Sequence, residues 1–195
     1  HSVWKANSDA YRAFGIYGFD TLEEFRERFR LPVAQFHQDN GVPEHLMEPV
    51  ERKFRDVYPQ YAPLIHVFPD VAGVLAELQR RDILLGVVSN IPTQFLKGHL
   101  RDFAIDNYFT ALVGQEDCDE QKPSPKPLLT ALRLLGVKQE DAMYVGDMEE
   151  DMMAAKAAGI MATAITRAEG YHSRRRLEKH KPDYFISDLT ELLMV

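Results

Sequence analysis

Apolar residues follow a helical period in the first third of the chain. Up to about residue 61 they recur three or four positions apart, which predicts amphipathic helices, and no strand is expected there. Thr21 followed by Glu24 is typical of a capping box, which opens one of these helices. The expected helices cover Ser2–Phe14, Leu22–Phe29, a short stretch from Pro32 to Gly41, and Pro43–Val57.

After about His66 the pattern changes to short β-rich runs that alternate with helical stretches. The expected strands are Ile83–Val88, Phe109–Val113, Ala142–Val145, Met161–Ile165 and Tyr184–Ile186. Helical patterns begin at Val71 and cover Thr93–Phe103, Lys126–Leu135, Glu150–Ala158, Ser173–His180 and Leu189–Leu193. The first strand is continuously apolar, as in parallel strands that are buried on both faces.

This regular alternation predicts an α/β fold with a doubly wound, Rossmann-like parallel sheet. We therefore expect a small all-helical domain at residues 1–65 and an α/β core at residues 66–195.

Composition narrows the class of protein. The 195 residues carry 23 Lys and Arg against 30 Asp and Glu, a formal charge of −7 that disfavours a nucleic-acid binder. One cysteine cannot form an internal disulfide, and the longest apolar run, Ile83–Val88, is far shorter than a membrane helix needs. The basic cluster from Arg174 to Lys181 is most simply a solvated helix face, and no two histidines stand at zinc-ligand spacing. We expect a cytoplasmic protein that binds neither nucleic acid nor a membrane.

Residues that directly follow a strand are the first candidates for a site, because ligands of open parallel sheets bind beyond the carboxyl ends of the strands. Ser89 and Asn90 follow the first strand. A hydroxyl group and backbone N–H groups near a helix start suit a phosphate oxygen. The same pair is also common in an ordinary turn after a strand, so these residues alone do not decide between the two interpretations.

Lys122 stands in a proline-rich segment after the second strand. Pro123, Pro125 and Pro127 alternate with other residues, which predicts an extended, rigid backbone that aims Lys122 into a site as a fixed positive charge. A loop lysine in solvent explains the segment equally well.

Gly146 and Asp147 follow the third strand, and Asp151 comes one helical turn later. Carboxylates so placed suit Mg²⁺, which takes one or two carboxylates together with waters and phosphate oxygens. Acidic residues are also favoured at helix N-termini in general, which accounts for Glu149 and Glu150. It does not account for the glycine ahead of Asp147, which we expect to permit a tight turn of the backbone.

Together and in this order, the three segments resemble motifs of the haloacid dehalogenase-like hydrolase superfamily. Val87–Asn90 is similar to its second motif, Lys122–Pro125 to its third and Tyr144–Asp151 to its fourth. The stretch from Ala154 to Gly159 extends the fourth motif, and the closing segment from Lys181 to Leu189 is typical of the phosphoglycolate-phosphatase-like branch. The resemblance covers residues 66–195 closely. Residues 1–65 match only in kind, as the helical cap domain of this branch.

The first motif of the superfamily has no counterpart in this sequence. It consists of two aspartates separated by one residue and followed by Gly-Thr, and it supplies the nucleophile, the general acid/base and the central strand of the sheet. Nothing in His1–Gly18 matches it, and Asp9 lies inside a helical stretch. Without that strand, two buried strands would expose rows of unpaired backbone groups. We therefore expect a further strand upstream of residue 1, and we expect the 195-residue chain alone to be inactive.

The resemblance implies a Mg²⁺-dependent phosphatase that acts on a small phosphate ester through an aspartyl-phosphate intermediate, beneath a cap that excludes water. The implied roles are Asp147 as metal ligand, Asp151 as a supporting acid near the metal, Ser89 and the Asn90 backbone as binders of a phosphate oxygen, and Lys122 as the charge that neutralises the nucleophile and the phosphoryl group. Lys126 is the alternative lysine, but it does not directly precede the Pro-Ser-Pro run.

Two alternatives stay open. A phosphomutase uses the same motifs and a helical cap, and a non-catalytic binding or regulatory module is indicated if the nucleophile is truly absent. A dehalogenase is disfavoured, because the pair Gly146–Asp147 is the metal-binding version of the fourth motif. The cap region contains no motif that reads a leaving group, so the identity of the substrate is left open, as is the oligomeric state.

Overall fold

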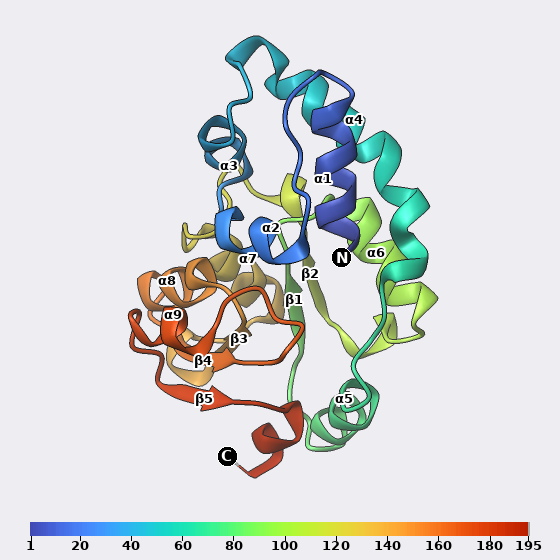
Figure 1. The fold of residues 1–195 in the computed structure, drawn as a ribbon. Helices are drawn as coiled ribbons and strands as arrows, with labels where there is room; N and C mark the ends of the chain where they lie inside the picture. The colour runs from blue at the N-terminus through green and yellow to red at the C-terminus, as the bar shows by residue number, and fades with distance from the viewer. Residues whose placement is uncertain (195) are drawn as a thin grey trace. The chain divides into compact units, whose positions relative to one another are not determined.

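Helices alone make up the first of the two units into which the chain divides, His1–Val67 and Phe68–Val195 (Figure 1). The structure is a computed structural model that describes residues 1–194. The helices of the first unit are α1(Ser2–Arg12), α2(Leu22–Arg28), α3(Val33–Asp39) and α4(Met47–Val57), with 3₁₀ helices η1(Glu44–Leu46) and η2(Tyr58–Leu64). The expectation of helices without strands before residue 61 is confirmed.

Helix α2 begins where the sequence predicts, and its cap differs in one detail. The Thr21 hydroxyl accepts a hydrogen bond from the backbone N–H of Glu24 at 3.1 Å. The Glu24 carboxylate accepts from the N–H of Asp20 at 3.0 Å, one residue earlier than a capping box requires. Both contacts satisfy backbone donors around the helix start that would otherwise be free.

An aromatic core holds the helical unit together. Tyr11, Phe19, Phe25 and Phe36 are all at most 1% exposed. Phe19 meets Phe25 edge to face at 5.2 Å between ring centroids and stacks on Phe36 at 5.6 Å, both favourable aromatic geometries. His37 is buried in the same core, where its Nδ1 lies 2.9 Å from the Tyr11 hydroxyl.

The second unit alternates strands and helices. Its elements are α5(Val71–Arg80), β1(Gly86–Val88), α6(Thr93–Asp102), η3(Asp106–Tyr108), β2(Ala111–Val113), η4(Gln115–Asp117), α7(Lys126–Leu135), η5(Gln139–Asp141), β3(Met143–Gly146), α8(Glu149–Ala157), β4(Met161–Ile165), α9(Arg174–Glu178), β5(Tyr184–Ile186) and η6(Leu189–Met194). All strand pairs are parallel, with β1 next to β2 in one sheet and the order β3–β4–β5 in another. The predicted α/β class is confirmed.

The core of this unit is built from small and branched apolar side chains. Ala162 and Ala164 of β4 are fully buried against Met152, Ala154 and Ala155 of α8. Alanines let the helix approach the strand closely, while Leu128, Leu132 and Leu177 fill the space from α7 and α9. This packing fixes the start of α8, where the candidate site begins.

The first predicted strand is shorter and less buried than expected. Only Gly86–Val88 of the run is paired, and Ile83 and Leu84 are 47% and 51% exposed. Within residues 1–194, β1 pairs with β2 on one edge and no strand lies along its other edge. The expectation of a strand buried on both faces is therefore wrong for the described chain, in which no residue of the run is fully buried.

No helix within residues 1–194 has the length and apolar composition that a bilayer crossing requires.

Candidate functional site

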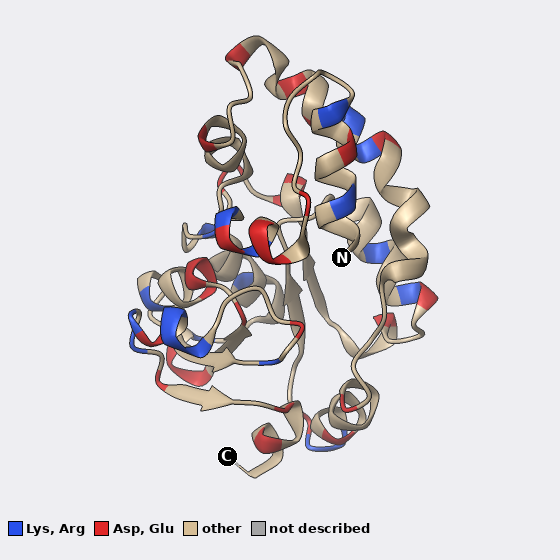
Figure 2. Cartoon of the chain, viewed as in Figure 1, with Lys and Arg blue, Asp and Glu red and all other residues tan. Residues whose placement is uncertain are grey.

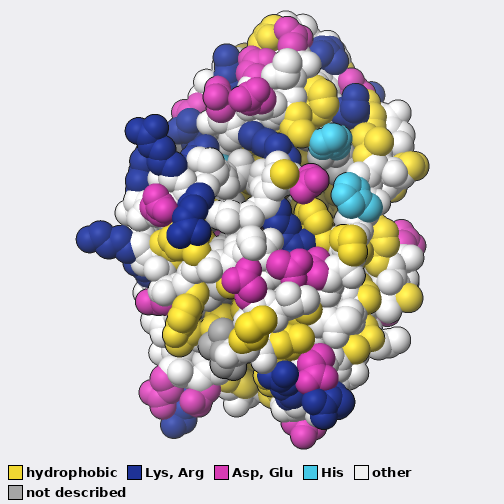
Figure 3. All heavy atoms as spheres, turned by 60° about the horizontal axis from the view of Figure 1, so that its bottom comes forward, with side chains coloured by type: hydrophobic (Ala, Val, Ile, Leu, Met, Phe, Trp, Pro, Cys, Tyr) yellow, Lys and Arg dark blue, Asp and Glu magenta, His cyan; other side chains and the backbone are white. Residues whose placement is uncertain are grey.

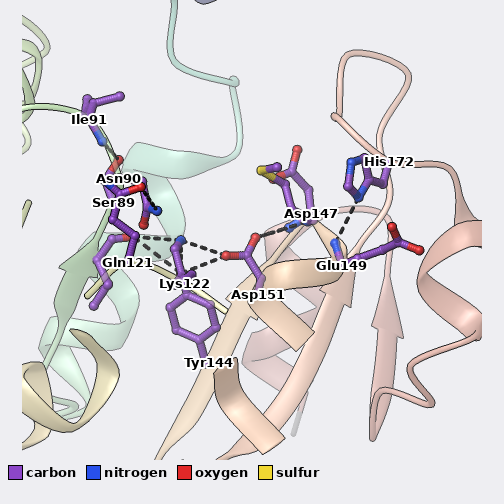
Figure 4. A network of polar contacts seen from close by, with 12 residues as sticks. Ser89, Asn90, Ile91, Gln121, Lys122, Tyr144, Asp147, Glu149, Asp151 and His172 are labelled. Atoms are coloured by element: carbon purple, nitrogen blue, oxygen red, sulfur yellow. Dashed lines mark hydrogen bonds and ion pairs between the residues drawn. The ribbon is translucent and has the colours of Figure 1, made fainter. Parts of the chain in front are cut away.

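The polar groups predicted from three separate segments meet near the carboxyl ends of β1 and β3 (Figure 4). Lys122, which is only 6% exposed, donates from Nζ to Oδ1 of Asp151 at 2.7 Å. The same ammonium group lies 2.9 Å from the Tyr144 hydroxyl and 3.4 Å from the carbonyl oxygen of Val88. A single buried lysine therefore links the second, third and fourth motif segments.

Asp151 is the centre of this network. Its Oδ2 accepts hydrogen bonds from the backbone N–H groups of Asp147 and Met148, each at 3.1 Å. These contacts cap the N-terminus of α8, and Oδ1 is left to face Lys122 and the Tyr144 hydroxyl, which lies at 3.2 Å. Both oxygens of Asp151 are thus occupied by protein donors.

A side chain at position 146 would collide with Asp151, and this steric reason accounts for the glycine there. A Cβ atom at this position would lie 2.4 Å from the Cβ of Asp151, which is closer than any real contact. Gly146 is not among the residues with positive φ, so the tight turn expected from the sequence is not the reason for the glycine. The glycine admits the carboxylate that organises the site.

Asp147 is held by the loop that follows β4. Its Oδ2 accepts from the backbone N–H of Tyr171 at 2.8 Å, and its carbonyl oxygen accepts from the N–H of His172 at 3.2 Å. His172 in turn accepts at Nδ1 from the N–H of Glu149 at 2.9 Å. Burial raises the pKa of Asp147, and the neighbouring charge of Asp151 raises it further.

Ser89 and Asn90 lie at the end of β1. The Ser89 N–H continues the β ladder to the Val113 carbonyl oxygen at 2.9 Å, and its hydroxyl accepts from the N–H of Ile91 at 3.3 Å. Asn90 donates from Nδ2 to the side chain of Gln121, the residue before Lys122, at 3.3 Å. The hydroxyl therefore lies in a turn beside the lysine segment (Figure 4).

The charge of Lys122 is stabilised by its neighbours. Burial by itself lowers the pKa of this lysine, but the charge of Asp151 and the Tyr144 group outweigh burial and raise the pKa above its usual range. Burial and the Asp151 charge also raise the pKa of Tyr144, so its hydroxyl keeps its proton at neutral pH. The site holds a permanent cation beside a neutral phenol.

The two candidate lysines have different surroundings. Lys126 is half exposed and pairs with Asp119 at 3.0 Å and Glu120 at 2.5 Å, both of them surface carboxylates. The backbone that carries Lys122 is not extended as expected, because the N–H of Ser124 bonds back to the Gln121 carbonyl oxygen at 3.0 Å and closes a turn. That turn directs Lys122 into the interior and leaves Lys126 at the surface.

A divalent metal ion fits the chemistry of Asp147. Its carboxylate is buried beside a second carboxylate and its pKa is raised, so a cation next to it would relieve the unfavourable charge. Within residues 1–194, no three His, Cys, Asp or Glu side chains are grouped so that they could hold a metal. One protein carboxylate completed by waters and substrate oxygens is a coordination that Mg²⁺ accepts and zinc does not.

Sequence reasoning missed two parts of the network. Tyr144 precedes Gly146 by two positions, so strand alternation places the Tyr144 side chain on the face of β3 that Gly146 leaves open for Asp151, and this signal was available from the sequence. The contacts of Tyr171 and His172 with Asp147 come from a loop after β4, and the sequence carries no periodic signal for them.

The basic cluster predicted as a solvated helix face is exposed at Arg174, Arg175, Lys179 and Lys181. Arg174 contacts Glu178 at 3.0 Å and Arg176 contacts Glu149 at 2.5 Å, and the basic residues lie in the first part of α9 (Figure 2). Figure 3 shows basic, acidic and hydrophobic side chains interspersed on the face that it draws.

Comparisons with known proteins identify a family and relatives to which this chain is similar. A family model described as haloacid dehalogenase-like hydrolase matches residues 4–165. Phosphoglycolate phosphatase 1 of Pseudomonas aeruginosa is 31% identical over 164 residues, which is 84% of this chain and 60% of the relative. The chain thus spans about 60% of the length of that curated relative.

Solved structures show the same fold. A haloacid dehalogenase-like family protein from Streptococcus pneumoniae superposes with a TM-score of 0.82 at 19% identity, covering 99% of this chain and 89% of that one. CbbY from Rhodobacter sphaeroides, solved in complex with phosphate, gives a TM-score of 0.78 at 23% identity, covering 98% and 88%.

Proposed function

Because the chain belongs to the haloacid dehalogenase-like hydrolase family, we propose that this protein is a Mg²⁺-dependent phosphatase of a small phosphorylated metabolite. The observation that carries the proposal is the buried Lys122–Asp151 ion pair, which stands beside Asp147 and near the end of β1. Buried ion pairs are costly unless they are fully hydrogen-bonded, so a buried lysine with these partners favours a functional site. The names of curated relatives such as the Pseudomonas phosphoglycolate phosphatase support the same class of reaction.

In this proposal the chain's residues bind and orient the phosphoryl group. Lys122 neutralises charge on the phosphoryl group and on the attacking carboxylate, and it stays protonated because of its neighbours. The Ser89 hydroxyl and the backbone N–H of Asn90 hold a phosphate oxygen. Asp151 keeps Lys122 and the start of α8 in place through four contacts.

Asp147 would hold the Mg²⁺ ion together with waters and phosphate oxygens. The ion, when bound, shields the charge on the nucleophile and the phosphate. The Tyr171 N–H fixes one oxygen of Asp147, so the carboxylate has a defined orientation before any ligand arrives.

The nucleophile belongs to a strand that we propose lies between β1 and β3, upstream of residue 1. In support, β1 and β3 belong to different sheets in the described chain, and each has an edge along which no described strand runs. On β1, the carbonyl oxygen of Val88 accepts long contacts of 3.4 Å from the Lys122 ammonium and from the Tyr144 hydroxyl, and not from a neighbouring described strand. An aspartate at the end of such a strand would attack phosphorus while the P–O bond to the alcohol of the ester breaks, so that an aspartyl-phosphate forms and the alcohol leaves. Water then hydrolyses the aspartyl-phosphate, which releases inorganic phosphate and restores the carboxylate.

The test is a phosphate-release assay on the protein with its upstream segment, using a panel of phosphoglycolate, sugar phosphates and nucleotides. We expect phosphate release that needs Mg²⁺ and stops with a chelator, and no turnover by residues 1–195 alone. Release that is unaffected by the chelator would contradict the metal assignment. Transfer of the phosphoryl group within a sugar phosphate, without release of phosphate, would identify a phosphomutase instead.

A further inference from the structure

An ion pair outside the site described above ties the loop after β4 to the start of α5. Both terminal nitrogens of the Arg167 guanidinium donate to the Asp70 carboxylate, one of them at 3.0 Å to Oδ1. The side chains are 12% and 8% exposed, and the guanidinium stacks on the Phe68 ring at 4.2 Å from its centroid. Two-point contact and stacking together fix the plane of the guanidinium group.

The Asp70 carboxylate is held by a third hydrogen bond besides the two from Arg167. Its Oδ2 also accepts from the backbone N–H of Leu189 at 2.8 Å, so the segment after β5 is attached to the same carboxylate. Burial alone would raise the pKa of Asp70, but the Arg167 and Leu189 hydrogen bonds lower it overall. The carboxylate is therefore charged at neutral pH and holds two loops.

Arg167 is connected to Asp147 through a short turn. The N–H of Gly170 bonds to the Arg167 carbonyl oxygen at 3.0 Å, and the next two residues, Tyr171 and His172, donate to Asp147 at 2.8 and 3.2 Å. A Cβ atom on Gly170 would lie 3.2 Å from that carbonyl oxygen and 3.5 Å from Oδ2 of Asp147. The turn is thus packed closely against the carboxylate that it orients.

We propose that Asp70 and Arg167 are positioning residues for Asp147, a role that rests on the metal-binding function proposed above. The pair anchors one end of the turn, and the other end supplies the N–H group that sets the carboxylate. The Nε of Arg167 is buried and has no hydrogen-bond partner among the described residues, so the anchor depends on Asp70. Partners that orient a metal ligand typically change metal affinity about 10- to 100-fold when removed.

The competing explanation is that the pair only packs α5 against the loops after β4 and β5. In that case its loss would lower stability and leave metal affinity unchanged. Asp70 follows Phe68 and Pro69, the first residues of the second unit, and the measurement below separates the two roles.

The experiment measures Mn²⁺ affinity by electron paramagnetic resonance, with Mn²⁺ alone as the probe, on the protein with its upstream segment. We expect Arg167→Gln and Asp70→Asn each to raise the Mn²⁺ dissociation constant about tenfold, with the double variant no worse than either single one. Arg167→Lys, which keeps the charge but not the two-point contact, should fall in between and serves as the second variant if the others fail to fold. Val74→Ala, a buried position on α5, is the control that lowers the melting temperature and leaves the dissociation constant at the wild-type value.

Wild-type affinity in folded Arg167 and Asp70 variants, or strictly additive effects in the double variant, would overturn the inference. Asp147→Asn separates this failure from failure of the proposed function. If the wild-type protein binds no Mn²⁺, or if Asp147→Asn binds it as tightly as wild type, the metal assignment itself is wrong. If Asp147→Asn abolishes binding and Arg167→Gln does not change it, only the positioning role is wrong.

Discussion

Lys122 carries its charge in surroundings where burial alone favours the neutral amine. The charge of Asp151 and the Tyr144 group reverse that preference, and together they raise the pKa of the lysine. Each partner of this cluster depends on the others, since any one left alone would be a buried polar group without compensation. Removing a single member is therefore expected to affect both stability and activity.

Replacing Lys122 tests this dependence. Lys122→Met leaves the Asp151 carboxylate buried beside Asp147 without a cation, so we expect a loss of about 3–5 kcal/mol in the free energy of unfolding and nearly complete loss of activity. Urea unfolding and a phosphate-release assay measure the two effects. Lys126→Met is the matched control and should be mild, because its partners are surface carboxylates. The reverse result would transfer the role to Lys126.

Gly146 offers a test of steric fit. In Gly146→Ala the added Cβ would meet the Cβ of Asp151 at 2.4 Å, so the carboxylate or the backbone must move. Overpacking of this kind typically costs about 1–3 kcal/mol, and the displaced Asp151 should reduce turnover as well. Thermal melting measures the loss of stability, and the phosphate-release assay measures the loss of turnover.

The control for this test is Gly73→Ala on α5, because a Cβ atom at this position meets open space. Gly136→Ala is unsuitable, because the φ of +69° at Gly136 is strained for alanine.

The site residues differ in how far sequence could predict them. Ser89 and Asp147 follow directly from one topological rule, because each stands after a parallel strand. The inward direction of Lys122 could not be derived from its prolines, because a turn rather than an extended backbone aims it. The Arg167–Asp70 pair joins residues 97 positions apart, and no local pattern marks such a contact.

At the level of elements, the periodicity of apolar residues predicted whether a segment is a helix or a strand. It did not predict the length of every element. Lys126–Leu135, Met161–Ile165 and Tyr184–Ile186 have the predicted bounds, since each combines a clear period with a marked end. The run Ile83–Val88 yields only three paired residues, because apolar composition predicts a strand without saying whether a neighbour pairs with it. Pairing is a property of the sheet and not of the segment.

The packing of α1 against α3 predicts a pH effect on the helical unit. Burial lowers the pKa of His37 from 6.5 to about 4, so the folded state favours the neutral ring. The resulting stabilisation is fully present above pH 6.5 and is lost as the pH falls towards 4, for a total of about 3 kcal/mol. Urea unfolding between about pH 4 and pH 7 measures this dependence, because this range spans the His37 pKa values of the folded and the unfolded states.

The comparison variant for this effect is His37→Gln, which keeps an acceptor near the Tyr11 hydroxyl and removes the titrating ring. We expect it to flatten the pH dependence, while His45→Gln, at an exposed position of η1, should leave it unchanged. An equally steep dependence in His37→Gln would show that another group is responsible.

At the scale of the whole molecule, residues 68–194 of the second unit form two parallel sheets, and among these residues no strand lies along the outer edge of β1 or of β3. An added central strand would pair both edges and join the two sheets into one. Unpaired strand edges leave backbone N–H groups open to water, so their amides should exchange quickly in the 195-residue chain.

Hydrogen exchange on the protein with and without its upstream segment tests this account of the sheet. We expect the amides that face the open edges of β1 and β3, those of Val88 and Val145, to become protected when the upstream segment is present, because the neighbouring amides already face β2 or β4. Amides of β4, which already has strands on both sides, should change little and serve as the internal control. Equal protection of β1 and β3 in both forms would mean that no strand is added there.

The central claim is that Asp147 holds the metal ion of a phosphoryl-transfer site, and one measurement addresses it most directly. Mg²⁺-dependent phosphate release is compared in wild type, Asp147→Asn and Asp141→Asn, all with the upstream segment present. Our account predicts no measurable release by Asp147→Asn at any Mg²⁺ concentration and wild-type release by Asp141→Asn, whose carboxylate lies in an exposed 3₁₀ turn. Undiminished release by a folded Asp147→Asn protein would contradict it.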